Sequence, residues 1–481
     1  MQLIWLRSDL RQSDNTALSA AAQRGPTVAV YLISPQQWLA HDDAPCKVDF
    51  WLRNLVTLSD SLHALNIPLL IRTADTWDQA PAVLLELCQQ HGIEAVHVNQ
   101  EYGINETRRD EAATQVLEAQ GIEFHSYLDQ LLFQPGTVLT QSGSYFQVFS
   151  QFRRICYNYL HRALPTIVES PQAQIAVPIE RDAIPQSVDG FAPPSESLRA
   201  LWPAGERHAQ QRLAHFADEQ IHYYKDERDL PAKPGTSQMS AYLAAGVISP
   251  RQCLHAALHS NHGEFESGSP GVFTWISELL WREFYKHILV GYPRVSRHRA
   301  FRLETEFLPW RDAPEELAAW KEGRTGIPII DAAIRQLLET GWMHNRLRMV
   351  VAMFLTKNLL IDWREGERFF MQHLIDGDLA ANNGGWQWSS STGTDSVPYF
   401  RIFNPLSQSE RFDPEGRFIK HWLPELADLN KKEIHNPSIA GGLFGIANYP
   451  RPMVDLKKSR ERALTAFKNL PSRALTVSGY E

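Results

Sequence analysis

The sequence predicts a chain of two folded parts, an α/β domain with a parallel sheet and an all-α domain, joined by a long linker. In the first 130 residues, short β-rich runs alternate with segments of helical periodicity. From about residue 205 onward the periodicity is helical. Residues 165–200 between them are rich in proline and lack periodicity, which is typical of an extended linker.

The α/β domain is predicted from its β-rich runs, which are 3–6, 27–33, 68–72, 95–99 and 123–128. Helix-period segments such as 48–66 and 105–121 lie between the runs and serve as crossovers. This alternation favours a Rossmann-like five-stranded parallel sheet. No G-x-G-x-x-G motif follows the first run, so the usual dinucleotide fingerprint is missing.

We therefore expect an α/β domain over 1–130, a linker over 131–204 and a helical domain over 205–481. The helical domain is predicted from three-to-four-residue apolar spacing, clearest in 271–289, 327–341 and 346–360.

Net charge, cysteine spacing and the lack of long apolar runs limit which classes of function fit this protein. The net charge of −8 argues against a basic field over the whole protein, although a local basic surface stays possible. The four cysteines are scattered without metal-ligand spacing, which favours free thiols and no metal site. No signal peptide is visible, and no apolar run approaches the about 18–20 residues of a membrane span, so we expect a cytoplasmic protein without a membrane partner.

Two segments of the helical part combine polar groups in a way that suggests a ligand. In "PAKPGTSQMSAYLAAG", Gly235, Thr236 and Ser237 are predicted to open a helix, which is either a phosphate site or a simple N-cap. In "WISELLWREFYKH", Glu278 and Arg282 lie one helical turn apart among tryptophans. They form either a surface ion pair or a site that a polar ligand uses.

Two further segments leave similar alternatives open. In "GWMHNRLRMVVAMF" one arginine is predicted to face a ligand and another to face away, but structural ion pairs fit equally well. In "DGDLAANNGGWQWSSSTGTD", Asp376 and Asp378 suit a ligand-binding loop or a helix start. The stretch lacks the apolar spacing of a core helix, and Trp386 and Trp388, if extended, point to opposite sides.

These segments, together with "WLRSDLRQSDNTAL", "RTGIPIIDAAIRQL" and "DWREGERFF", closely resemble the photolyase/cryptochrome family. The resemblance covers essentially the whole chain in the same order and is nearest to bacterial folate-type (class I) cyclobutane pyrimidine dimer photolyases. It implies a monomeric DNA-repair enzyme, a carbon–carbon lyase without an obligate protein partner. Blue light drives electron donation from FADH⁻ to a flipped-out pyrimidine dimer, the ring splits, and the electron returns.

The resemblance places FAD in the helical domain, which accounts for the missing dinucleotide fingerprint. The positions that match flavin and phosphate contacts are Tyr224, Thr236, Ser237, Gln238, Met239, Ser240, Trp275, Arg282, Arg348, Asp376, Asp378 and Asn382. Arg348 is expected to pair with Asp376, and Asn382 to offer the flavin an acceptor or a donor as its redox state changes.

The resemblance also implies roles around the lesion. Glu278 and Asn345 match groups that hydrogen-bond the dimer carbonyls, and the apolar wall matches Trp281, Trp388 and Met349. The positions that match contacts to the DNA backbone are Arg228, Arg346, Arg401 and Gln408. The electron-hopping chain to the flavin matches Trp310, Trp363 and Trp386.

An antenna chromophore is implied in the α/β domain, where His41, Asn105 and Glu106 match contacts to 5,10-methenyltetrahydrofolate. The chain departs from the pattern at Ser296 and Arg297, where the nearest relatives have Cys and Lys. Polarity and charge are kept, so folate is the expected antenna, with a deazaflavin or an empty site as alternatives.

Three other functions compete with dimer repair. A cryptochrome-type photoreceptor is disfavoured because Asn382 is replaced in plant-type and animal-type cryptochromes, and because no long tail follows "RERALTAFKNL". A (6-4) photolyase is disfavoured because Asn345 and Met349 stand near the expected lesion in place of a histidine pair. The remaining alternative is an electron-transferring flavoprotein unrelated to DNA.

Overall fold

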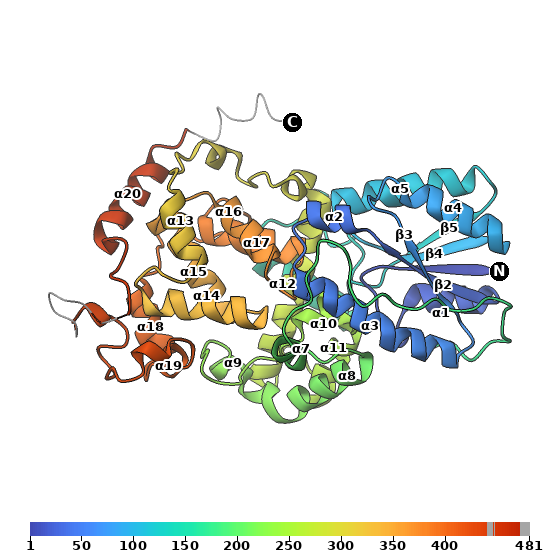
Figure 1. Ribbon diagram of the computed structural model, residues 1–481, viewed down its shortest axis with the longest axis horizontal. Helices are drawn as coiled ribbons and strands as arrows, with labels where there is room; N and C mark the ends of the chain where they lie inside the picture. The colour runs from blue at the N-terminus through green and yellow to red at the C-terminus, as the bar shows by residue number, and fades with distance from the viewer. Residues whose placement is uncertain (440–445, 447, 472–481) are drawn as a thin grey trace. The chain divides into compact units, whose positions relative to one another are not determined.

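The computed structural model describes residues 1–439, 446 and 448–471 and shows two compact units (Figure 1). The first unit comprises Met1–Lys225, Ser237–Pro293 and Ile375–Asp378. The second unit comprises Asp226–Thr236, Arg294–Leu374 and Leu379–Glu481. The functional boundaries expected near residues 130 and 204 stay a prediction.

The first unit contains the predicted parallel sheet. Its strands are β1 (Gln2–Leu6), β2 (Thr27–Ile33), β3 (Leu69–Thr73), β4 (Ala95–Asn99) and β5 (Glu123–Tyr127). Their order is β3-β2-β1-β4-β5, and every neighbouring pair is parallel. The α/β prediction is confirmed, with the predicted ranges of β2 and β4 matching in full.

Helices cover both faces of this sheet. Helices α1 (Thr16–Arg24) and α3 (Pro45–Ala64) lie on one face, and α4 (Ala80–His91) and α5 (Ile104–Glu118) on the other (Figure 1). Every residue of β2 is consequently buried, which explains why its sequence is an unbroken apolar run. The short helix α2 (Pro35–Ala40) follows β2.

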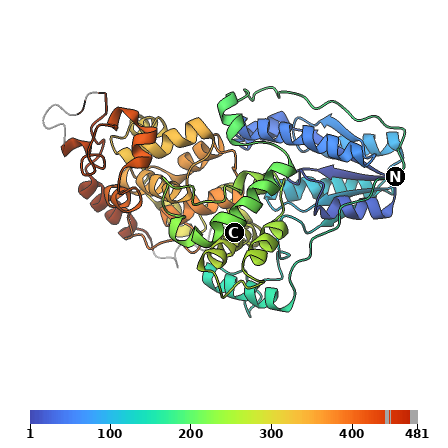
Figure 2. The same cartoon turned by 90° about the horizontal axis from the view of Figure 1, so that it is seen from below.

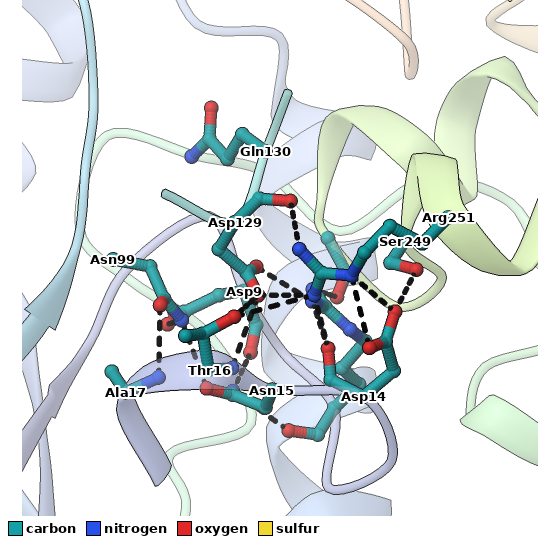
Figure 3. Close-up of polar contacts among 12 residues, drawn as sticks. Asp9, Asp14, Asn15, Thr16, Ala17, Asn99, Asp129, Gln130, Ser249 and Arg251 are labelled. Carbon is teal, nitrogen blue, oxygen red and sulfur yellow. Dashed lines mark hydrogen bonds and ion pairs between the residues drawn. The ribbon is translucent and has the colours of Figure 1, made fainter. Parts of the chain in front are cut away.

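Buried charges occupy the region where the strand order reverses, between β1 and β4 (Figure 3). Open α/β sheets usually bind ligands at such a switch point, beyond the carboxyl ends of the strands. Here Arg11 and Arg251 donate to Asp129 at 2.6 and 2.8 Å, and Arg251 also donates to Asp14 at 3.0 Å. These four residues, the buried tetrad, join the β1–α1 loop to α11 (Pro250–Ser260).

The linker lies along the α/β layer (Figure 2). Residues 163–195 contain no helix or strand, in agreement with the proline-rich sequence, and are flanked by α6 (Phe149–Arg162) and α7 (Glu196–Leu201). Gln174 and Asp182 donate their backbone N–H groups to the carbonyls of Leu65 and Leu69 at 3.0 and 2.9 Å. The segment is therefore fixed to the sheet layer by main-chain bonds.

Helices dominate the remainder of the described chain, as predicted. Those up to residue 291 are α8 (Glu206–His215), η1 (Phe216–Gln220), η2 (Ile221–Tyr223), α9 (Tyr224–Glu227), α10 (Ser240–Ala244), α11 and α12 (Pro270–Gly291). Those that follow, up to residue 371, are η3 (Pro293–Arg297), η4 (Leu303–Phe307), α13 (Pro314–Lys321), α14 (Pro328–Thr340), α15 (Asn345–Met353), η5 (Phe354–Asn358) and α16 (Trp363–Met371). The last are α17 (Leu379–Ser390), α18 (Pro405–Phe412), α19 (Arg417–Trp422), η6 (Pro424–Leu426), η7 (Pro437–Ile439) and α20 (Leu456–Lys468).

The second unit has its own core, in which Trp320, Trp363 and Trp386 are almost completely buried. Large apolar side chains from α14, α15 and α16 surround these rings. Across the described residues, no helix has the length and apolar character needed to cross a membrane.

Candidate functional sites

The loop before α10 differs from its prediction. Gly235, Thr236 and Ser237 do not open a helix, because α10 begins only at Ser240 and has five residues. Gln238, with a φ of 52°, interrupts the helical path, so the predicted helix start at these residues is wrong, and their contact with a phosphate stays a prediction. The loop is instead held by side chains: Trp275 Nε1 donates to Ser237 Oγ at 3.3 Å.

Aromatic rings line the same part of the first unit. The ring of Phe216 contacts Trp275 at 5.1 Å and Tyr224 at 5.9 Å between centroids. Tyr224, Trp275 and Met239 are all buried, whereas Gln238 and Ser240 are exposed. The positions predicted to contact the flavin in this segment are therefore of two kinds, buried apolar or aromatic side chains and exposed polar ones.

On helix α12, Glu278, Trp281, Arg282 and Tyr285 are neither buried nor fully exposed, whereas Trp275 is buried. The ring of Trp281 stacks on Phe149 with 3.8 Å between centroids. Arg282 donates to the carbonyl oxygen of Gln130 at 2.6 Å, which fixes its guanidinium. A carboxyl group and a supported indole thus lie side by side on one helix face.

A second acidic residue of α12 has a structural role. Glu283 is buried and accepts the backbone N–H groups of Leu132 and Phe133 at 3.0 and 2.8 Å. Sequence reasoning did not separate it from Glu278, because the two lie close together on one helix and only burial distinguishes them.

Asp376 and Asp378 lie immediately before α17, at the end of the first unit's last segment. Asp376 is buried, and Asp378 accepts a hydrogen bond from Lys286 at 2.6 Å. Lys286 was missed by sequence reasoning because 92 residues separate it from Asp378. Its only signal was a cation on α12 one helical turn after Arg282.

The tryptophan-rich stretch forms helix α17, which corrects the expectation that it lacks the pattern of a core helix. Small residues compensate for the missing apolar stripe. A Cβ at Gly366 would lie 2.0 Å from the Trp386 ring, so the ring packs directly on the α16 backbone. Trp386 is buried and Trp388 partly exposed, because residues two apart on a helix are separated by about 200°.

The amide of Asn382 has a fixed orientation. Its Nδ2 donates to the carbonyl oxygen of Glu367 at 2.9 Å, and neighbouring Asn383 donates to Glu367 Oε1 at 2.8 Å. This bond uses one of the two N–H donors of the amide, so the oxygen and the second N–H of Asn382 are left for a ligand. The acceptor and donor roles expected for Asn382 both stay a prediction.

The three tryptophans matched to electron transfer belong to one apolar cluster. Trp363 and Trp386 are members of the core of the second unit, and Trp310 packs against it. Among the described residues no ring pair joins two of the three directly; Trp386 contacts Trp320 at 6.0 Å. Trp320 is the aromatic neighbour that sequence reasoning missed.

Helix α15 presents the predicted polar face. Asn345 is exposed, Arg348 and Met349 are partly exposed, and Arg348 donates to the carbonyl of Met343 at 2.8 Å. Arg346 pairs with Asp229 at 2.8 Å and lies 4.5 Å from the centre of the Phe412 ring. His344, the N-cap of α15, accepts the Arg346 N–H at 3.2 Å and fixes the helix start.

The remaining positions matched to DNA contacts lie in the second unit. Arg228 is partly exposed and follows α9, Arg401 is exposed within the α17–α18 connection, and Gln408 is in α18. They are three surface positions on different segments.

The antenna positions of the first unit come together in part. Asn105 and His41 contact each other at 3.0 Å, and the His41 ring meets the edge of Trp77 at 4.8 Å. Burial, with the nearby Glu101 carboxylate, raises the pKa of Glu106 to about 7. Sequence reasoning missed Trp77, over which the Arg109 guanidinium lies at 4.4 Å. Ser296 is buried and Arg297 exposed in η3.

A parallel sheet covered on both faces, together with helices that carry partly exposed polar and aromatic side chains, fits a flavoprotein of the photolyase type. Residues 275–469 match the family model of the FAD binding domain of DNA photolyase, and residues 2–172 match that of DNA photolyase. The chain belongs to the DNA photolyase family, and FAD is its cofactor.

Relatives agree along nearly the full length. The chain is 41% identical to the deoxyribodipyrimidine photo-lyase of Escherichia coli over 469 residues, covering 97% of this chain and 98% of that protein. It is 42% identical to the enzyme of the same name from Vibrio cholerae, covering 97% and 99%.

Solved structures agree as well. A class III photolyase from Agrobacterium tumefaciens superposes with a TM-score of 0.87 at 35% identity, covering 97% of each chain. A cryptochrome from Synechocystis superposes with a TM-score of 0.85 at 26% identity, covering 97% of this chain and 99% of the cryptochrome. The fold is therefore shared by both branches, and sequence identity favours the repair branch.

Proposed function

We propose that the chain is a light-driven DNA repair enzyme that splits cyclobutane pyrimidine dimers. The observation that carries this proposal is the identity of 41–42% with proteins named deoxyribodipyrimidine photo-lyase over 97% of the chain. A photoreceptor without repair activity is the less supported alternative, because the cryptochrome match has 26% identity.

Each unit, taken by itself, offers groups that suit a flavin. In the first unit, the Trp275 indole is hydrogen bonded to Ser237 and Lys286 is paired with Asp378, which supplies an aromatic surface and polar groups. In the second unit, the Asn382 oxygen suits the N–H of a reduced flavin ring. When bound and reduced, FAD supplies the electron that light excites. The remaining proposed contacts are Tyr224, Thr236, Gln238, Met239, Ser240, Arg282, Arg348 and Asp376.

For the substrate, we assign Glu278 as a hydrogen-bonding group for the dimer carbonyls. The supported ring of Trp281 beside it offers an apolar surface for the extruded bases. In the second unit, Asn345 is exposed on α15 and Met349 lies one turn away on the same helix face. Together with Trp388, these residues supply the hydrogen bonds and apolar contacts that a flipped dimer needs.

DNA backbone contacts are assigned to Arg228, Arg346, Arg401 and Gln408. All four side chains are exposed or partly exposed, and each carries a positive charge or an amide group. Such groups suit phosphate contacts, which position a duplex without reading its sequence. A net charge of −8 requires such a basic surface to be local.

For photoreduction, we assign Trp310, Trp363 and Trp386 as the electron path. Their membership of one apolar cluster supports this role, and Trp320 contacts Trp386 within it.

The antenna is proposed to be 5,10-methenyltetrahydrofolate, with His41, Asn105 and Glu106 as contacts. The His41–Asn105 contact and the Trp77 ring beside it form a polar and aromatic surface of the kind that a pterin binds. Release of a pterin absorption band on denaturation, together with the flavin, would support this choice, and a deazaflavin spectrum would contradict it. We further propose a cytoplasmic monomer without an obligate protein partner.

The deciding experiment is a repair assay. Purified protein with its flavin reduced is illuminated with near-UV or blue light in the presence of DNA that carries one thymine dimer. Dimers should disappear only in the light. A matched sample kept in the dark measures any loss of dimers that does not depend on light. Intact dimers after illumination of fully reduced, flavin-loaded protein would favour the photoreceptor alternative.

A further inference from the structure

Lys357 differs from the other buried lysines of the described chain. Lys47 and Lys286 are also buried, but each is paired with a carboxylate, Asp43 and Asp378 respectively, at 2.6 Å. Lys357 in η5 is fully buried and has no carboxylate partner among the described residues. An ammonium group without a counter-charge is costly inside a protein, so an apolar side chain would suit fold stability better.

The amine of Lys357 bridges two ends of one connection. Its Nζ donates to Ser391 Oγ at 2.7 Å and to the carbonyl oxygen of Arg401 at 3.2 Å. Ser391 is the first residue after α17, and Arg401 lies just before α18. One buried side chain therefore closes the loop of residues 391–401.

The closed loop presents aromatic and cationic groups to solvent. Tyr399 and Phe400 are 38% and 55% exposed, and Arg401 is exposed beside them. The Tyr399 ring stacks on Phe467 of α20 with 5.9 Å between centroids, and the same Phe467 ring lies 5.7 Å from the Lys357 amine. Tyr399 is thus held against Phe467, while Phe400 and Arg401 stay accessible to solvent.

The base of the loop holds an uncommon backbone conformation. Ser391 has a φ of 62°, in the left-handed region that a serine rarely adopts. Its hydroxyl donates to the carbonyl oxygen of Val397 at 2.7 Å while accepting from Lys357. The ammonium therefore supports both a strained residue and the turn that follows it.

We propose that Lys357 is a positioning residue for DNA binding, a clasp that holds the loop 391–401 so that Tyr399, Phe400 and Arg401 meet a damaged duplex. The chemistry fits, because exposed aromatic rings stack on unpaired bases and an arginine contacts phosphate. The inference rests on the proposed repair function and adds a residue that itself never touches DNA.

The test is a double-mutant cycle on flavin-loaded protein, with fluorescence anisotropy on labelled DNA that carries one thymine dimer. Lys357→Met and Arg401→Ala should each weaken binding about tenfold. The double variant should be little weaker than Arg401→Ala alone, because Lys357 acts through the same loop. Lys458→Met on exposed α20 is the matched control for loss of one positive charge and should keep the affinity.

The outcomes separate the two proposals. If Arg401→Ala leaves binding unchanged, the assigned DNA contact is wrong, whatever Lys357 does. Suppose that Arg401→Ala weakens binding. The proposed role of Lys357 is then contradicted if Lys357→Met has no effect, or if its effect adds in full to that of Arg401→Ala. Flavin content and Tm should stay near the unmodified values, since a stability role alone would lower Tm and spare affinity.

A second variant keeps the proposal testable if Lys357→Met does not fold correctly. If Lys357→Met loses its flavin, Ser391→Ala carries the test, because it removes one acceptor and leaves the amine in place. Affinity should fall about fivefold, in the same Arg401-dependent manner, for a lost hydrogen bond of about 1 kcal/mol. Unchanged affinity of Ser391→Ala would overturn the clasp.

Discussion

Lys286 and Asp378 form an ion pair with 2.6 Å between Nζ and Oδ2, and both side chains are largely shielded from solvent. The pair connects the middle of α12 to the residue before α17. Lys286 fixes the orientation of the Asp378 carboxylate, which we propose as a flavin contact. The electrostatic field of Lys286 also reaches Glu106, a proposed antenna contact.

The first prediction follows from this pair. Lys286→Met should lower the affinity for FAD, because Asp378 loses the buried ammonium group that orients its carboxylate. Removing one partner of a charged hydrogen bond costs about 1–3 kcal/mol, or about five- to 150-fold in affinity. The measurement is the flavin-to-protein ratio after dialysis, followed by titration of the apoprotein with FAD.

Lys286→Arg is the matched control, since it keeps the charge and restores most of the affinity. Full flavin retention by Lys286→Met at unchanged Tm would contradict the positioning of Asp378 by this lysine.

The second prediction concerns Glu278. Glu278→Ala should lower the repair yield per absorbed photon several-fold while the flavin stays bound, because it removes a hydrogen-bonding group assigned to the dimer carbonyls and not to the cofactor. The measurement pairs dimer loss under calibrated light with the flavin absorption spectrum. Glu283→Gln, on the same helix, separates local folding from chemistry: it should lower Tm, because Glu283 accepts two buried N–H groups. A flavin-free Glu278→Ala protein would show that the assignment is wrong.

The third prediction separates electron supply from repair. Trp310→Phe should slow photoreduction of oxidised flavin at least tenfold and leave repair by chemically pre-reduced protein unchanged. Trp310 is only partly buried, so phenylalanine fits without a large cavity. Transient absorption after a light pulse gives the first rate and the dimer assay the second. Equal losses in both would remove Trp310 from the proposed path.

The fourth prediction is a dependence of stability on pH. Burial raises the pKa of Asp9 from 3.8 to about 6, although the backbone N–H of Arg7 and the amide of Asn99 donate to its carboxylate. The folded protein therefore keeps this proton to a higher pH than the unfolded chain. The resulting stabilisation is complete below pH 4 and disappears as pH rises through 6, a change of at most about 3 kcal/mol.

Asp9→Asn should flatten this dependence. Tm measured at pH 5 and at pH 7.5 should differ less in the variant than in the unmodified protein. Asp60→Asn, on the exposed side of α3, is the control and should leave the difference unchanged. Identical pH profiles for the Asp9 variant and the unmodified protein would mean that Asp9 is ionised in both folded and unfolded chains at these pH values.

The sequence is informative wherever one local pattern decides the structure. Every residue of β2 and β4 is buried because helices cover both faces of the sheet, and their predicted ranges match. Helix α12 likewise follows from its periodicity. In these elements the local preference and the tertiary environment agree.

Prediction fails where distant contacts decide. Helix α17 contains glycines and asparagines that disfavour a helix, and it forms because its small residues allow close packing, such as Trp386 on Gly366. The helix expected at Gly235 is displaced because Gln238 adopts a positive φ, which no local pattern announces. The partnership of Lys286 with Asp378 spans 92 residues and is equally invisible in the sequence.

The buried tetrad restricts how this sequence can change over evolutionary time. Arg11, Arg251, Asp14 and Asp129 bring two positive and two negative charges into one dry interior. Loss of any one of them leaves an unbalanced charge that costs about 3–5 kcal/mol, a large fraction of the stability of a typical domain. Replacing all four residues by apolar ones at once is expected to be tolerated. Replacing them one at a time is not, because the first substitution gives a variant with an unbalanced buried charge. We therefore expect substitutions in the tetrad to be tolerated only in combinations that keep its charges balanced, although none of its residues needs to touch substrate.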